Sequence, residues 1–321
     1  MSRPGWKKGV KVAVKAVLAA LVLWAVGRHV VRTWRDLRAH GETLHVEPAW
    51  IALAVALYLA GLVACGVFFT RVLRASPTPI GYVPAVRAYL ISHLGKYVPG
   101  KAMVVIMRVG LVAPYGARPA TAAFATLYET LVMMAAGGLI AALGFAFPPV
   151  QGWAMALGGA LGLALLVVVD PLVFPRLSRL ISMPFPGVGP EALPRITRRL
   201  MVEGLLWSSA GWVLLGLSQV AVVRALSPSG VRPGHWPAVT GGVALATVAG
   251  FVVAVMPGGL GVREWVLMPA LTPTLGPDLA VIAALALRLT WVLGELLAAA
   301  ALSLVRLPLP VPVPVPDSPS P

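Results

Sequence analysis

The feature that most limits what this chain can fold into is a series of apolar runs, most of them about as long as a helix that crosses a bilayer. The runs cover residues 12–26, 50–70, 119–147, 153–173, 204–223, 238–256 and 279–305. A helix needs roughly 20 apolar residues to cross the hydrocarbon core, and these runs lack the period-2 alternation of strands. The sequence therefore predicts an all-α, polytopic integral membrane bundle of about seven spans.

The charge of the chain fits the same environment. Charged residues make up 12% of the sequence, whereas soluble domains carry roughly 25%. The net charge of +15 suits either nucleic acid or an anionic membrane surface. Lys and Arg lie mostly between the apolar runs, and no nucleic-acid reader module is present. We therefore expect a multi-pass protein of the cell membrane that contacts lipid and no nucleic acid.

The first apolar run has two interpretations, a cleaved signal peptide or a retained transmembrane helix. Residues 25–27 form a passable small-residue cleavage site, but further long spans follow, and Trp24 and Arg28 suit the interfacial end of a helix. We favour the retained helix. Basic residues near the span ends favour an inside amino terminus, whereas the arginines of residues 28–38 argue against it, so the orientation stays open.

Three regions follow from this reading. Residues 1–45 form a basic amino terminus with the first helix and a loop, residues 46–305 form the main transmembrane domain, and residues 306–321 form a Pro-rich, disordered tail. Gly158 and Gly162 stand four apart and favour close packing of two helices within the chain over a dimer contact. No stretch remains for a catalytic domain in water.

Metal and cofactor sites are not expected. The single cysteine, Cys65, lies inside an apolar run, and the five histidines are scattered without a helical ligand pair.

The segment 85–112 carries too many charges for a span that faces lipid, so we expect it to be interfacial or re-entrant. Pro99 and Gly100 should break its helix, and a new helix can begin there with free amides that attract an anion. Lys101 and Arg108 are seven residues apart and would share one face of that helix.

The second half of the chain contains a similar interruption. Pro257 is followed by Gly258, Gly259 and Gly261, and then by Arg263 and Glu264. Paired Gly/Pro interruptions in two halves of a membrane protein point to a transporter's central binding site and are consistent with an inverted pseudo-repeat. The alternative is two ordinary turns between spans.

Several ionisable residues lie within apolar runs. Glu129, Arg288 and Glu295 should face the bundle interior, because an unpaired charge in lipid costs several kcal/mol. Arg288 and Glu295 are seven apart and would share a face. They are either functional groups or structural ion pairs. The interior candidates contain more cations than anions, which favours an anionic head group as ligand.

Two strings carry a resemblance to a known family. The string AYLISHLGKYVPGK at residues 88–101, with Arg108 and Glu129 after it, and the string PGGLGVRE at residues 257–264, with Arg288 after it, resemble the lysylphosphatidylglycerol synthase transmembrane-region family, also called flippase-like. The resemblance covers residues 46–305. It implies a helical membrane domain that handles lipids, and that in family members accompanies lipid aminoacylation or polyprenyl-phosphate sugar transfer, or stands alone. Thr130 departs from the family, in which a basic residue often follows the glutamate.

The leading hypothesis is a non-enzymatic protein that translocates or presents an anionic or polyprenyl-phosphate-linked lipid. The alternative is the membrane subunit of a lipid-modifying transferase whose catalytic domain is a separate soluble chain; a structural scaffold ranks last. We expect Glu129 to point inward and the two interrupted segments to meet across a polar cavity. The candidate substrate-binding residues are Lys96, Pro99, Gly100, Lys101, Arg108, Glu129, Pro257, Gly258, Gly259, Gly261, Arg263, Glu264, Arg288 and Glu295, with no catalytic residue, metal or cofactor.

Overall fold

The fold is taken from a computed structural model of the chain. It describes residues 46–77, 79–98, 102–147, 152–177, 194–227, 229–252, 262–305 and 307–308, together with Trp24, Arg28, Val31, Arg32 and Arg35. The side chains of Val262, Glu264 and Trp265 are outside this description. The tail after Pro308 and nearly all of the first apolar run, residues 12–26, also lie outside it.

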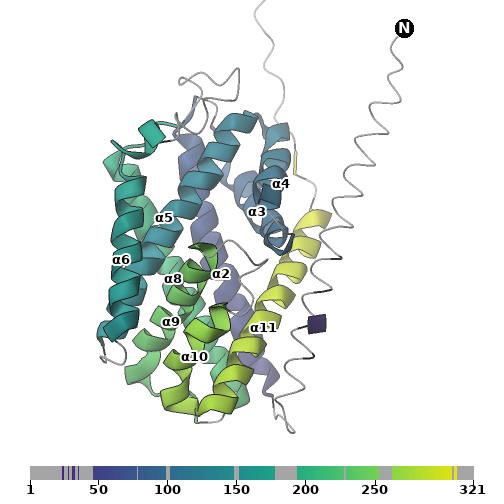
Figure 1. Ribbon diagram of the computed structural model, residues 1–321. Helices are drawn as coiled ribbons and strands as arrows, with labels where there is room; N and C mark the ends of the chain where they lie inside the picture. The colour runs from purple at the N-terminus through teal and green to yellow at the C-terminus, as the bar shows by residue number, and fades with distance from the viewer. Residues whose placement is uncertain are drawn as a thin grey trace, which may run out of the picture.

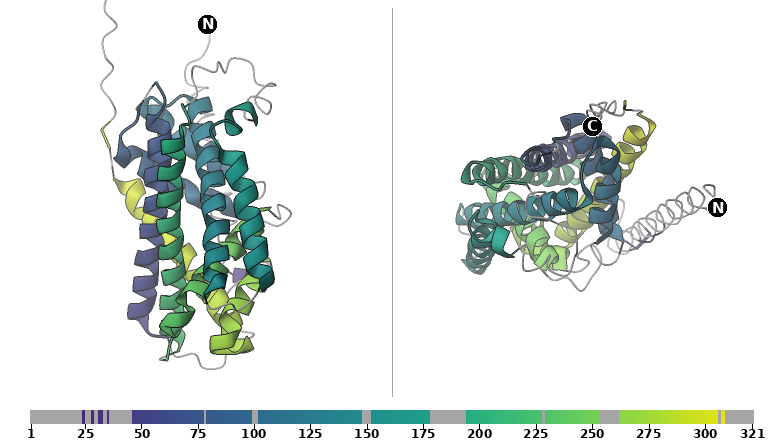
Figure 2. Two further views of the ribbon diagram at one scale, coloured as in Figure 1. Left: turned by 90° about the vertical axis from the view of Figure 1, so that its left-hand side faces the viewer. Right: turned by 90° about the horizontal axis from the view of Figure 1, so that it is seen from above.

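Six described helices are long and apolar enough to cross a membrane. They run roughly along one axis (Figures 1 and 2) and correspond to the six later runs of the sequence. They are α2 (Pro48–Arg74), α5 (Pro119–Ala146), α6 (Gly152–Val169), α8 (Arg198–Leu226), α9 (Trp236–Val252) and α11 (Pro277–Leu304). The prediction of an all-α, polytopic membrane bundle is confirmed.

The starts of the long helices follow from local sequence. Pro48, Pro119 and Pro277 each stand in the first turn of their helix, where the missing amide hydrogen costs nothing. Helix α8 instead begins at a side-chain cap, because the Thr197 hydroxyl accepts a hydrogen bond from the Leu200 amide at 3.2 Å.

Two regions contain short helices in place of spans. The first is α3 (Tyr82–Ser92), the 3-10 helix η1 (His93–Tyr97) and α4 (Ala102–Val112), and α3 packs beside α4 toward one end of the bundle (Figure 1). At 1.5 Å per residue, a helix of 11 residues is only about 16 Å long and cannot cross a core of about 30 Å. The interfacial or re-entrant character expected for residues 85–112 is therefore consistent with these short helices.

The second short region is α10 (Val262–Leu275), which packs against α9 and α11 toward the opposite end of the bundle (Figure 1). It is 14 residues long and contains Pro269 and Pro273. Each proline removes a backbone donor from the helix, which is tolerated in a membrane where neighbouring helices cover the freed carbonyls.

Helices α5 and α6 approach closely through glycine. A Cβ atom added to Gly138 would lie 2.5 Å from the backbone nitrogen of Gly162, and one added to Gly158 would lie 2.9 Å from the Ala141 Cβ. Gly158 and Gly162 therefore serve an interface within the chain, as the sequence predicted.

The glycine contact predicts a stability effect. Replacing Gly138 by Ala should lower the free energy of unfolding by about 1–3 kcal/mol, because the backbone of α6 must move away. Gly110→Ala is the matched control, since a Cβ there meets nothing within 4 Å, and it should gain up to about 1 kcal/mol from helix propensity. Thermal unfolding in detergent measures both. Equal melting temperatures for the two variants would contradict the close α5–α6 packing.

Candidate functional site

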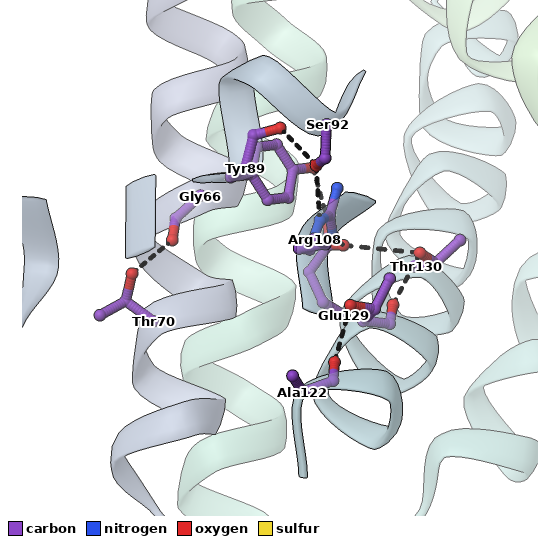
Figure 3. Close-up of polar contacts among 9 residues, drawn as sticks. Gly66, Thr70, Tyr89, Ser92, Arg108, Ala122, Glu129 and Thr130 are labelled. Atoms are coloured by element: carbon purple, nitrogen blue, oxygen red, sulfur yellow. Dashed lines mark hydrogen bonds and ion pairs between the residues drawn. The ribbon is translucent and has the colours of Figure 1, made fainter. Parts of the chain in front are cut away.

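The first polar cluster inside the bundle joins α3, α4 and α5 around Arg108. The Arg108 Nη1 atom lies 3.1 Å from Glu129 Oε2, and its Nε donates a hydrogen bond to Ser92 Oγ at 3.0 Å. The Tyr89 hydroxyl donates to the other carboxylate oxygen, Glu129 Oε1, at 2.9 Å. Figure 3 shows Arg108 held between Ser92 on one side and Glu129 on the other. We call Arg108, Glu129, Tyr89 and Ser92 the Arg108 cluster.

The Arg108 cluster is buried, which bears on whether Arg108 can bind a ligand. Its four residues are at most 2% exposed, and the Arg108 guanidinium also lies over the Tyr89 ring at 4.1 Å from the ring centroid. The expectation that Glu129 points inward is confirmed. The view of Arg108 as a cation in an open cavity is wrong, because a neighbouring carboxylate neutralises it and packed side chains cover it. The departure at Thr130 leaves Glu129 paired, because Arg108 supplies the cation.

The second polar cluster surrounds Glu295 on α11. Its Oε1 atom forms an ion pair with Lys96 Nζ and accepts a hydrogen bond from the Tyr58 hydroxyl. Lys96 Nζ also donates to the Tyr58 oxygen at 3.2 Å, and His93 Nε2 stands 4.0 Å from the same Glu295 oxygen. We call Glu295, Lys96, Tyr58 and His93 the Glu295 cluster. It ties η1 and α2 to α11.

Aromatic stacking holds this second cluster in place. The rings of Tyr58 and Trp291 are nearly parallel, with centroids 4.6 Å apart. Trp291 Nε1 donates to Ser218 Oγ at 3.1 Å, and Ser218 Oγ donates to the Ala54 carbonyl at 2.8 Å. These contacts join helices α2, α8 and α11 next to the Glu295 cluster. The stacking on Trp291 fixes the position of the Tyr58 ring and hence of its hydroxyl.

A pocket lies between α9, α10 and α11, next to the Glu295 cluster. Its lining is mostly apolar but includes two guanidinium groups: the lining residues are Val243, Ala246, Thr247, Arg263, Leu267, Ala284, Leu287, Arg288 and Trp291. We call it the arginine pocket. Its cavity volume is about 30 Å³, room for about one or two water molecules, so a larger ligand could enter only if the lining residues moved apart.

The arginine pocket and the Glu295 cluster are neighbours. Trp291 lines the pocket and also stacks on Tyr58 in the cluster. The positive charges of Arg263 and Arg288 are close enough to act on Lys96. Arg263 Nε is buried and has no hydrogen-bond partner among the described residues. Three of the predicted cations thus lie near one another in the described structure, and one of them, Lys96, pairs with Glu295.

Other predicted site residues cannot be placed. Seven of them lie outside the described residues, namely Pro99, Gly100, Lys101, Pro257, Gly258, Gly259 and Gly261. Glu264 belongs to α10, but its side chain is outside the description. The prediction that the two Pro-Gly breaks meet is therefore untested. In the described part, Lys96 precedes the first break and Arg263 follows the second. The charge of Arg263 acts on Lys96.

Sequence reasoning missed the partners that come from apolar runs. Tyr58, Tyr89 and His93 contact the predicted carboxylates, yet none of the three was among the predicted site residues. A usable signal existed for the tyrosines, since a hydroxyl buried within a span must find an acceptor. Among the described residues, no group of three or more His, Cys, Asp or Glu side chains could hold a metal ion.

Comparison with known sequences gives the family. No curated protein matches the chain. Residues 12–299 match the family model described as lysylphosphatidylglycerol synthase TM region, which includes both interrupted segments and both polar clusters. This multi-pass membrane protein therefore belongs to the lysylphosphatidylglycerol synthase TM region family.

Proposed function

We propose that the chain binds the head group of an anionic lipid in the arginine pocket, and that it either translocates this lipid across the bilayer or presents it. The observation that carries the proposal is the presence of Arg263 and Arg288 in one largely apolar pocket within the bundle. A phosphate group is the natural ligand of guanidinium groups in such surroundings, because both can form two parallel hydrogen bonds.

The remaining lining supports a lipid rather than a free anion. Leu267, Leu287 and Trp291 offer hydrocarbon surface beside the two arginines. A lipid presents its phosphate next to its acyl or polyprenyl chain, so one ligand can satisfy both kinds of surface. Of the other predicted cations, Lys96 pairs with Glu295, Arg108 pairs with Glu129, and Lys101 lies outside the described residues.

The short helices give the proposal a route for motion. Segments at membrane depth that are not continuous helices are tolerated where they line a cavity or pack against protein, and in transporters they form the site around which one part of the bundle rocks against the other. Here α10 carries Arg263 and follows one interruption, while η1 carries Lys96 and precedes the other. Movement of either segment would change the cations that face the pocket.

A transport assay tests the proposal. Vesicles that contain the purified protein and a trace of fluorescent phosphatidylglycerol should exchange the dye between leaflets faster than protein-free vesicles, and faster than matched vesicles with fluorescent phosphatidylcholine. Arg263→Gln should slow the exchange of phosphatidylglycerol at least about tenfold, the equivalent of one lost charge-assisted hydrogen bond.

Arg199→Gln is the matched control, because it removes one arginine whose side chain is 88% exposed. It should keep the wild-type rate. Equal rates with and without protein for both lipids, or equal rates for the two variants, would contradict the proposal. Phosphatidylglycerol that binds but does not move would instead favour the alternative role, a membrane subunit that presents lipid to a separate transferase.

A further inference from the structure

The two oxygens of the Glu295 carboxylate have unequal surroundings. The Oε1 atom receives Lys96 and Tyr58, whereas the Oε2 atom is buried and has no hydrogen-bond partner among the described residues. The side chain of Glu295 is fully buried. A proton can therefore be added at Oε2 without displacing either donor at Oε1, and it would remove a negative charge from a site of low polarity.

The ionisable groups around Glu295 come from every element that packs against α11 there. Helix η1 contributes Lys96, His93 and Tyr97, α2 contributes Tyr58, α10 contributes Arg263, and α11 itself contributes Arg288. Arg87 of α3 instead donates to the Leu302 carbonyl at 2.8 Å, and the nearby polar residues of α8, Ser218 and Gln219, do not titrate. Glu295 is the only carboxylate among these described side chains.

Lys96 can face two anions. Its side chain is 22% exposed, whereas that of Glu295 is 0% exposed, so Lys96 is the more accessible member of the pair. If a phosphate arrived there while Glu295 remained ionised, the two anions would repel each other at low dielectric, which is costly. Loss of the negative charge on Glu295 removes this repulsion.

We infer that Glu295 takes up one proton when an anionic head group binds beside Lys96, so that lipid binding is coupled to proton binding. The proton comes from solvent and ends on Glu295 Oε2. Lys96 stays protonated and exchanges the carboxylate for the phosphate as its partner. His93 is 19% exposed and its Nε2 stands 4.0 Å from Oε1. The inference rests on the proposed function.

The coupling has a defined direction. If anion binding raises the proton affinity of Glu295, protonation of Glu295 must raise the anion affinity by the same factor. Binding of the anionic lipid therefore strengthens as the pH falls, by up to about tenfold per pH unit for one coupled proton. A pH difference across the membrane would then favour lipid release on the side with the higher pH.

Calorimetry counts the proton directly. The probe is dihexanoyl phosphatidylglycerol, whose phosphodiester keeps one negative charge throughout the pH range used, so it does not titrate itself. Titration of the wild-type protein in two buffers of different ionisation enthalpy should give uptake of about one proton per bound lipid. Glu295→Gln should bind the probe with no proton uptake and with an affinity that no longer depends on pH.

Glu203→Gln is the matched control. Glu203 is also a carboxylate in an ion pair within a span, 2.7 Å from Arg71, but it lies outside the Glu295 cluster. This variant should keep the wild-type proton count. If Glu295→Gln does not fold, the wild-type count alone decides: binding without proton uptake overturns the inference and leaves the proposed function standing. No binding of the probe at any pH overturns the proposed function itself.

Discussion

Replacing Arg108 by Met should lower the free energy of unfolding by about 3–5 kcal/mol, the usual cost of breaking a buried ion pair on one side. The variant leaves Glu129 at 1% exposure with the Tyr89 and Thr130 hydroxyls as its remaining partners. It also removes the cation that lies over the Tyr89 ring. Thermal unfolding of the purified protein in detergent measures the loss.

Two further variants make the Arg108 result specific. Arg71→Met makes the same replacement at the Arg71–Glu203 pair, whose side chains are 39% and 23% exposed, and it should cost no more than about 1 kcal/mol. The double variant Arg108→Met/Glu129→Gln should recover much of the loss, because no uncompensated charge remains inside the bundle. If Arg108→Met were no less stable than Arg71→Met, Arg108 would not be the structural residue described here.

The spans were the most predictable part of this fold. A membrane helix must satisfy its backbone internally and cover about 30 Å of hydrocarbon, so its length and composition are written in one continuous stretch of sequence. The close approach of α5 and α6 at Gly158 was predictable for a similar reason, because a small residue in a span has few other uses.

The ion pairs were less predictable. Arg288 and Glu295 were placed on one face because they are seven residues apart, yet the ion-pair partner of Glu295 is Lys96, 199 positions away. Helical periodicity fixes which residues of one helix share a face, but the helix that packs against that face is decided by the whole bundle. Lys96 could be recognised as an interior cation, whereas its partner could not be named.

Arg108 illustrates the same limit from the other side. Its spacing from Lys101 suggested that both cations would line one cavity, but spacing carries no information on whether a face meets a cavity or a packed neighbour. The face that carries Arg108 packs between α3 and α5, where Ser92 and Glu129 occupy its hydrogen-bonding groups. Sequence alone therefore could not show that Arg108 is buried and paired with Glu129.

The largest expected effect on lipid binding comes from removing both arginines of the arginine pocket. Arg263→Gln/Arg288→Gln should weaken binding of dihexanoyl phosphatidylglycerol at least about a hundredfold, since each charge-assisted hydrogen bond contributes roughly 1.5–3 kcal/mol. Glutamine keeps a polar side chain of similar reach, so the pocket is not simply emptied. Calorimetric titration gives the affinity, and mass spectrometry of copurified lipid gives an independent measure in which anionic lipids should be depleted.

The matched double variant is Arg118→Gln/Arg199→Gln. It also removes two positive charges, but from exposed positions at the starts of α5 and α8. It should bind phosphatidylglycerol within about twofold of wild type, because exposed charges far from a site are screened by salt. Melting temperatures of both double variants show whether affinity is measured on folded protein. If the two double variants bound equally well, Arg263 and Arg288 would hold α10 against α11 and the lipid would bind elsewhere. If instead only the pocket variant loses affinity, and loses it for phosphatidylglycerol but not for phosphatidylcholine, the two guanidinium groups recognise the net negative charge of the lipid, because both lipids carry the same phosphodiester.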